Sequence, residues 1–129
     1  MKNEVWLDEE NKVVRQKLID DAILEEAPEY FAEVSRLLDK LPQRHAIVDL
    51  SEAAASKILS RDAREHIVRY SAPVGYEKLA YIKASPPLRI MAKIMKVLAL
   101  RKHEDDGEIA FFADEAKALV WLKDGNNGA

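Results

Sequence analysis

The stretch Ala46-Ile47-Val48-Asp49-Leu50, followed by Ser51, decides the fold of this chain. A short run of aliphatic and β-branched residues is typical of a strand that is buried on both faces of a parallel sheet. We therefore expect residues 47–50 to form a central strand, with Ile47 and Val48 both buried. Asp49 and Ser51 then come at the carboxyl end of that strand, where open α/β sheets bind their ligands. The structural alternative, common for these residue types, is that Asp49 accepts a hydrogen bond from a loop amide and Ser51 starts a turn.

Apolar residues before this strand recur at the spacing of a helix, and two strand-like runs precede them. The helical positions are Ala27, Tyr30, Phe31, Val34, Leu37, Leu38 and Leu41. Pro28 is expected in the first turn, where proline is tolerated, and Pro42 ends the helix. Val5–Leu7 and Val13–Ile19 flank the polar turn formers at residues 8–11, which predicts an opening antiparallel hairpin.

Strand and helix signals alternate after the central strand. A helix is expected from Ser60, which is a plausible N-cap, to Tyr70. The later elements are a strand at Leu79–Ala84, a helix at Pro86–Leu100, a strand at Glu108–Phe112 and a helix at Asp114–Lys123. The predicted order is therefore β-β-α-β-α-β-α-β-α. It describes an α/β fold with a mixed sheet, in which helical crossovers make the later strands parallel.

The composition indicates one cytoplasmic domain. We place this domain at residues 1–124 of the 129, with a disordered polar tail at 125–129. Basic and acidic residues nearly balance, with a net charge of −3, so nucleic acid is not the expected partner. The chain has no cysteine, no signal-like N-terminus and no apolar stretch of membrane-spanning length. The histidines, His45, His66 and His103, lack ligand-like spacing, so we expect them in loops or on the surface and expect no metal or cofactor.

Three segments make this element order more specific. Ile47–Ser51 is a strand that ends in an Asp-Leu-Ser-like turn, and Ser85–Arg89 joins a strand to a long helix. Glu108–Phe112 is followed by the helical run Glu115–Leu122. With these segments the chain resembles the SpoIIAA-like branch of the STAS superfamily over nearly its whole length. The resemblance implies a STAS fold and a binding or signalling role, since members include anti-sigma-factor antagonists, nucleotide binders and relatives likened to lipid-binding CRAL-TRIO domains.

The chain departs from the antagonist members of that family at one motif. Those members carry an Asp-Ser-Ser-Gly-like turn whose serine is phosphorylated at the start of a helix. The corresponding stretch here is residues 53–62, where Ser56 and Ser60 are the nearby hydroxyls and no such motif occurs. We therefore do not expect phosphorylation of either serine to regulate this protein.

The expected helix Pro86–Leu100 carries more apolar surface than packing on a sheet requires. The face expected to cover the sheet consists of Leu88, Met91, Ala92, Met95, Leu98 and Ala99. A second apolar row consists of Ile90, Ile94 and Val97, with Arg89, Lys93 and Lys96 as a basic stripe beside it. Together the rows are wider than the ~100° stripe of an ordinary surface helix. A neighbouring helix of the same domain, a second copy of the chain, or an apolar ligand or membrane surface would cover the second row.

The start of this helix is another candidate site. Free backbone amides and the positive end of the helix dipole near Ser85 favour an anion, and Arg89 lies one turn into the helix. Pro86 and Pro87, however, remove two of the amide donors.

These observations predict a non-catalytic binding or regulatory module. The candidate contact residues are Asp49, Ser51, Ser85, Arg89, Ile90, Lys93, Ile94 and Val97. The candidate partners are a second copy in a homodimer, a lipid-like small ligand or a regulatory protein. The alternative is a small enzyme of hydrolase or phosphotransfer type that uses Asp49 at the carboxyl edge of the sheet. A phospho-acceptor receiver with a magnesium site would need Asp20 and Asp21 beside Asp49, but that pair follows the second strand of a hairpin, which is the wrong register.

Overall fold

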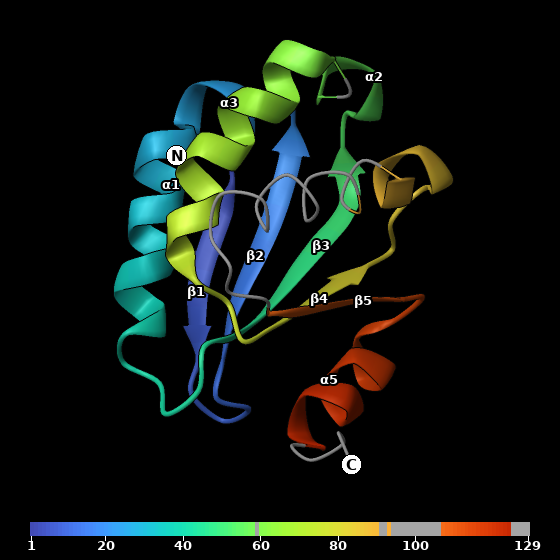
Figure 1. Cartoon of the computed structure of the whole chain (residues 1–129). Helices are drawn as coiled ribbons and strands as arrows, with labels where there is room; N and C mark the ends of the chain where they lie inside the picture. Colours follow the sequence, from blue (N-terminus) through green and yellow to red (C-terminus); the bar gives the residue numbers. More distant parts are fainter. Residues whose placement is uncertain (59, 91–92, 94–106, 125–129) are drawn as a thin grey trace.

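A computed structural model describes residues 1–58, 60–90, 93 and 107–124 of the chain. The strands are β1 (Glu4–Asp8), β2 (Val13–Asp20), β3 (His45–Ala53), β4 (Lys78–Ile82) and β5 (Glu108–Phe112). The helices are α1 (Ile23–Leu38), α2 (Ala55–Ile58), α3 (Arg61–Ser71), the 3-10 turn η1 (Ala72–Val74) and α5 (Glu115–Lys123). Residues 86–90 and 93 are also helical, and the rest of the predicted helix 86–100 and the predicted tail 125–129 lie outside the described residues. The structure confirms an α/β fold with the predicted alternation of strands and helices (Figure 1).

The five strands lie in the sheet in the same order as in the chain. β1 pairs with β2 in the antiparallel sense, which confirms the opening hairpin. The neighbours β2, β3, β4 and β5 all pair in parallel. β3 is therefore the central strand, as predicted, and β1 and β5 lie at the two ends of the sheet (Figure 1).

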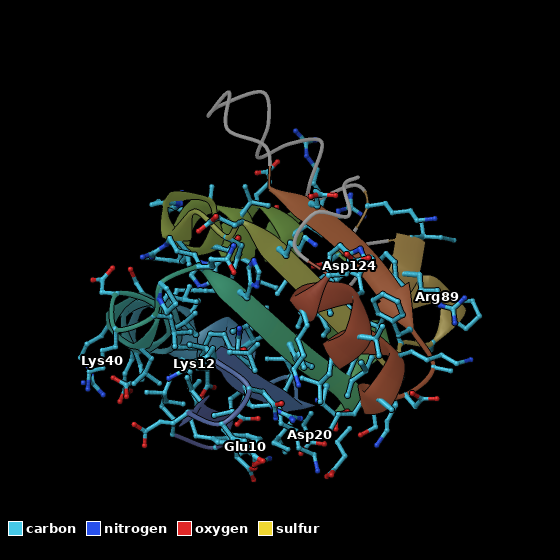
Figure 2. All side chains as sticks on the ribbon, turned by 90° about the horizontal axis from the view of Figure 1, so that it is seen from below. Glu10, Lys12, Asp20, Lys40, Arg89 and Asp124 are labelled. Carbon is cyan, nitrogen blue, oxygen red and sulfur yellow. The ribbon has the colours of Figure 1, made fainter. Side chains whose placement is uncertain are left out.

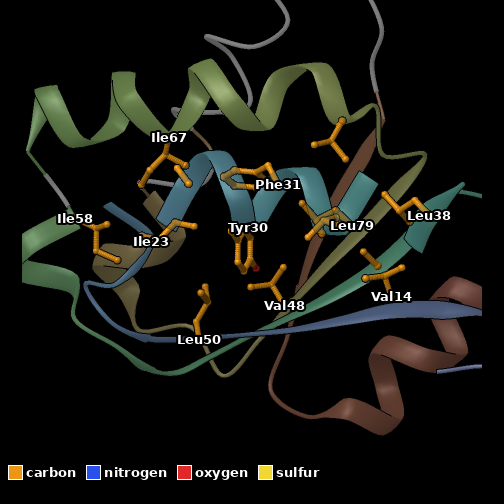
Figure 3. Close-up of a cluster of buried hydrophobic side chains, with 14 of the residues drawn as sticks. Val14, Ile23, Tyr30, Phe31, Leu38, Val48, Leu50, Ile58, Ile67 and Leu79 are labelled. Atoms are coloured by element: carbon orange, nitrogen blue, oxygen red, sulfur yellow. The ribbon is translucent and has the colours of Figure 1, made fainter. Parts of the chain in front are cut away.

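Helices cover the two faces of the sheet unequally. α1 and α3 pack against each other on one face, and α5 packs against β4 and β5 on the other. Figure 3 shows the larger hydrophobic cluster between the sheet and the layer of α1 and α3, with α5 on the opposite side of the sheet. Val48 of β3 belongs to this larger cluster and Ile47 to the smaller one, because successive side chains of a strand point to opposite faces.

α1 begins at Ile23 and not at Ala27, so Pro28 lies inside the helix and the prediction of a first-turn proline is wrong. The buried side chain of Ile23 and the carboxylate of Glu26 hold the early turn. Glu26 accepts hydrogen bonds from the backbone amides of Lys2 and Asn3, at 2.6 and 3.1 Å. Burial would raise the pKa of Glu26, but these donors favour the carboxylate and lower it. Such contacts offset the ~3 kcal/mol that an interior proline costs a helix.

The closing helix, α5, packs on the sheet through few of its apolar side chains. Ala118 and Leu122 of α5 are buried, whereas Ala116 is exposed and Val120 is 69% exposed. Asp114 caps the first turn by accepting a hydrogen bond from Lys117 N at 2.9 Å. This short helix therefore covers the sheet with a narrow buried stripe, beside which Leu119 and Trp121 are partly buried, and only Ala116 and Val120 of its apolar residues face away.

The burial of β3 on both faces gives a direct test of the fold. Ile47 is 1% exposed and Val48 is 4% exposed. We expect Ile47→Ala to lower the free energy of unfolding by about 2–5 kcal/mol, because the lost methyl groups leave a cavity. Urea denaturation measures this change, and Ser51→Ala, at an exposed position of the same strand, is the control with little expected effect. A loss below about 1 kcal/mol for Ile47→Ala would contradict a two-sided core.

His45 opens β3 and is buried, so the prediction that the histidines lie in loops or on the surface is wrong for this residue. Burial lowers the pKa of His45, and the nearby ammonium of Lys78 acts in the same direction, against Glu77 and Glu108. The protonated form is therefore disfavoured in the folded protein.

This lowered pKa predicts a loss of stability on mild acidification. The unfolded chain protonates His45 near pH 6.5, before the folded protein does, so the contribution is fully present above that pH and is lost as the pH falls toward the folded pKa. We expect the free energy of unfolding to be lower at pH 5.5 than at pH 7.5. Urea denaturation of His45→Gln, which cannot titrate, should show a smaller difference between the two pH values. An equal difference in both proteins would exclude His45 as the cause.

Candidate functional site

Asp49 lies inside β3, because this strand continues to Ala53. The predicted position of Asp49 at the carboxyl edge of the sheet is therefore wrong. Lys17 of β2 is paired with Asp49, and Ile19 is paired with Glu52, so β3 holds one more residue than β2 between these two pairs. This irregularity is a β-bulge, which disturbs the ladder of backbone hydrogen bonds.

The carboxylate of Asp49 accepts a backbone hydrogen bond at this bulge. Its Oδ1 atom accepts a hydrogen bond from Ser51 N at 2.8 Å, across the extra residue of the strand. The contact is the structural role that the residue types allowed, except that the amide lies in a strand and not in a loop. Ser51 is exposed within the strand and does not start a turn.

Charged side chains surround Asp49 on the sheet face that α5 covers in part. Lys17 Nζ lies 2.6 Å from Glu52 Oε2, and this contact raises the pKa of Lys17, with smaller effects from Asp49 and Glu4. Farther along β2, Arg15 lies between the carboxylates of Asp8, at 3.1 Å, and Glu115, at 2.7 Å. Each of these cations is thus neutralised by neighbouring carboxylates, as on a solvated protein surface.

The helix that begins at residue 86 holds the other predicted contacts. Arg89 N donates a hydrogen bond to Ser85 O at 3.0 Å, and Pro86 and Pro87 have no amide hydrogen. Among residues 86–89, at most Leu88 N is left for an anion, so the predicted anion site is weak. The Ser85 hydroxyl oxygen is buried and has no hydrogen-bond partner in the described part of the chain.

The side chains of this first turn point in two directions. Leu88 is 1% exposed and belongs to the larger hydrophobic cluster, whereas Ile90 is 61% exposed. Arg89 and Lys93 are both exposed. The Lys93 ammonium lies 5.8 Å from the centre of the Phe111 ring of β5, which in turn stacks on Tyr81 of β4. An exposed apolar side chain therefore lies beside two exposed basic residues.

The structure separates the predicted contacts into two groups. Ser85, Arg89, Ile90 and Lys93 lie together at the helix start, on the side of the sheet that Leu88 packs against. Asp49 lies with Ile47 on the face of α5, so it does not join that group. Ile94 and Val97 lie outside the described residues.

The two serines considered for phosphorylation lie on either side of the α2–α3 junction. Ser60 is the N-cap of α3, as predicted, and its hydroxyl accepts a hydrogen bond from Ala63 N at 3.2 Å. Ser56 lies in α2.

The acidic residues of the receiver hypothesis do not form a metal site. Asp20 pairs with Lys2 at 2.7 Å, and Asp21 lies 3.6 Å from Lys57. Among the residues that the structure describes, no group of three or more histidines and carboxylates is placed to hold a metal ion. In the same part of the chain no helix has the length and apolar character needed to cross a membrane.

Sequence reasoning missed a polar cluster inside the larger core and a groove beside β1. Gln16 of β2 is buried and accepts a hydrogen bond from the Tyr30 hydroxyl, while its Nε2 donates to the Tyr76 hydroxyl at 3.3 Å. Burial raises the pKa of both tyrosines, which keeps both hydroxyls protonated. The groove includes Val5 and Trp6 of β1. An exposed tryptophan in an end strand was the available signal for it.

No protein-family model matches this chain, and no curated protein has a significantly similar sequence.

The role of Asp49 in the bulge can be tested by removing its acceptor oxygen. We expect Asp49→Ala to lower the free energy of unfolding by about 0.5–1.5 kcal/mol, since Ser51 N loses its partner near the surface. Asp49→Asn retains a side-chain oxygen and should lose less. Urea denaturation compares the two variants, and equal losses would show that the charge of Asp49, not the hydrogen bond, matters.

Proposed function

We propose that this chain is a non-catalytic binding module whose contact surface is the outward side of the helix that begins at residue 86. The observation that carries the proposal is the contrast between Leu88, 1% exposed, and Ile90, 61% exposed. Leu88 already anchors the helix to the core, so Ile90 adds nothing to the packing of the described domain. Covering an exposed isoleucine side chain contributes about 1.5–3 kcal/mol to the free energy of binding.

The charges around Ile90 indicate the kind of partner. Arg89 and Lys93 lie beside it, and Arg89 extends away from the fold on the opposite side of the molecule from Lys40 (Figure 2). An amphipathic ligand, with an apolar body and a negative group, would satisfy both the isoleucine and the two cations. A regulatory protein or a second copy with the same chemistry on its surface is the macromolecular equivalent. The sequence places Ile94 and Val97 at helical spacing after Ile90, which would extend the apolar row.

The resemblance to SpoIIAA-like STAS proteins supports a binding role in the cytoplasm. It rests on the element order and on the closing strand and helix. The enzyme alternative gains nothing from the geometry, because Asp49 lies inside β3 and is engaged by Ser51 N. A screen of the purified protein with hydrolase and phosphatase substrates tests this alternative, and activity that Asp49→Asn abolishes would overturn the proposal.

The proposed surface is tested by placing a charge on it. We expect Ile90→Glu to reduce co-purified ligand or to break an assembly, and to leave the melting temperature of the ligand-free single chain unchanged, because the side chain is exposed in the single chain. Native mass spectrometry of the protein as purified reports both ligand and subunit number, and a thermal melt reports stability. Val120→Glu is the matched control, since Val120 is 69% exposed on α5, over the other face of the sheet.

Three outcomes would count against this surface. A lowered melting temperature of the ligand-free single chain for Ile90→Glu would mean that Ile90 packs inside the single chain. Unchanged mass and ligand content would mean that Ile90 only faces water. The same loss of ligand or assembly with Val120→Glu would mean that a charge at any exposed apolar residue causes this loss.

A further inference from the structure

A groove of about 750 Å³ lies where β1 meets the outer side of α1. β1 is at one end of the sheet, and within the described chain its other edge has no strand beside it. The apolar part of the groove includes Val5 and Trp6 of β1 and Ala32 of α1. Val5 and Trp6 are successive residues of the strand, so their side chains point to opposite faces of the sheet. A groove that both residues line therefore runs along the edge of β1.

The charges that line the groove are mainly negative. Glu4, Glu29 and Glu33 contribute three carboxylates, and Arg36 contributes one guanidinium. Arg36 is engaged by Glu33 through two hydrogen bonds of 2.8 and 2.6 Å. Glu4 and Glu29 are exposed, so a net negative potential faces any segment that enters the groove.

Trp6 gives this edge its apolar contact. Its side chain is 44% exposed, although it pairs across the hairpin with Arg15. Tryptophan is enriched among the residues that dominate binding energy at protein interfaces. An end strand also offers backbone N–H and C=O groups for pairing with another extended segment.

From these features we propose that an extended, basic peptide segment of a partner protein binds along β1 as a sixth strand. Alternate side chains of such a segment point to opposite faces, so one set would lie over Trp6 and the other would lie toward α1. The segment that best fits this edge has apolar residues that alternate with lysine or arginine. The apolar residues would cover Trp6, and the basic residues would reach Glu29.

A second copy of this chain fits the same edge poorly. Two β1 strands that pair antiparallel about Trp6 place Glu4 of one copy opposite Asp8 of the other. Like charges directly opposite each other destabilise a strand pair. Each copy would also bring the carboxylates of its own Glu4 and Glu29 to the contact. The charge of the groove therefore selects a basic partner over self-association.

The proposal is independent of the surface at Ile90. The helix that carries Ile90 follows β4, and β1 and β4 lie toward opposite ends of the sheet (Figure 1). Trp6 itself can report binding. In the background Trp121→Phe, Trp6 is the remaining tryptophan of the chain. Circular dichroism first establishes that this variant is folded, and the emission of Trp6 is then followed during titration with synthetic peptides.

The probe is an acetylated and amidated hexapeptide of alternating lysine and valine. We expect saturable binding with a shift of Trp6 emission to shorter wavelength. A peptide with glutamate in place of lysine should bind at least tenfold more weakly. An analogue N-methylated at every residue keeps the charges but cannot donate backbone hydrogen bonds, and it should also bind at least tenfold more weakly.

Variants of the protein locate the contact. Glu29→Lys should weaken binding of the lysine peptide at least fivefold, whereas the charge-matched control Glu10→Lys, in the hairpin turn, and Ile90→Glu should leave it unchanged. Equal binding of the N-methylated peptide would exclude strand pairing, and equal binding of the glutamate peptide would exclude charge selection. Light scattering that shows a dimer which Trp6→Lys dissociates would assign the edge to a second copy. Each of these results, or an unshifted Trp6 emission, would overturn the proposal.

Discussion

Parallel strands that succeed one another in the sheet as they do in the chain must be joined by crossovers, and crossovers of the same hand lie on the same face. In this protein α1, α3 and the helix start at Leu88 accordingly share one face and one large core. The other face is covered only by the segment after the last strand, which in the described chain is α5. The smaller cluster of Ile47, Ala80, Ala118 and Leu122 is the result.

Because helices cover the two faces unequally, the less covered face carries the paired charged residues. α5 packs mainly on β4 and β5, so the same face of β1 and β2 is left to charged side chains, where Lys17 and Arg15 lie among carboxylates. Asp49 belongs to that half of the sheet, opposite Lys17. The Asp49 carboxylate accepts a hydrogen bond from a backbone amide at the β-bulge and lies opposite a lysine. This is a local structural role, and residue type alone does not distinguish it from a role in a binding site.

The fold was predictable where one local signal determined the structure. Ile47 and Val48 marked a strand buried on both faces, and Ser60 marked a helix start, and each is where its pattern indicated. The misplaced features depend on contacts between distant segments. The first turn of α1 is held by Lys2 and Asn3 from before β1, and the extension of β3 beyond Leu50 depends on pairing with β2. Single-sequence patterns do not report such contacts.

The same long-range contacts determine how well β1 can serve as a template for another strand. Asn3, directly before β1, is buried; its Nδ2 donates to Glu26 Oε1 at 2.8 Å and its Oδ1 accepts from Ile19 N at 2.8 Å. On the core side, Gln16 of β2 is fixed by Tyr30 and Tyr76. The hairpin is therefore joined to α1 at its start and in its middle, although only one of its faces is covered by helices. A strand held in this way loses little conformational freedom when a partner pairs with it, so the ordering cost of binding falls mainly on the incoming segment.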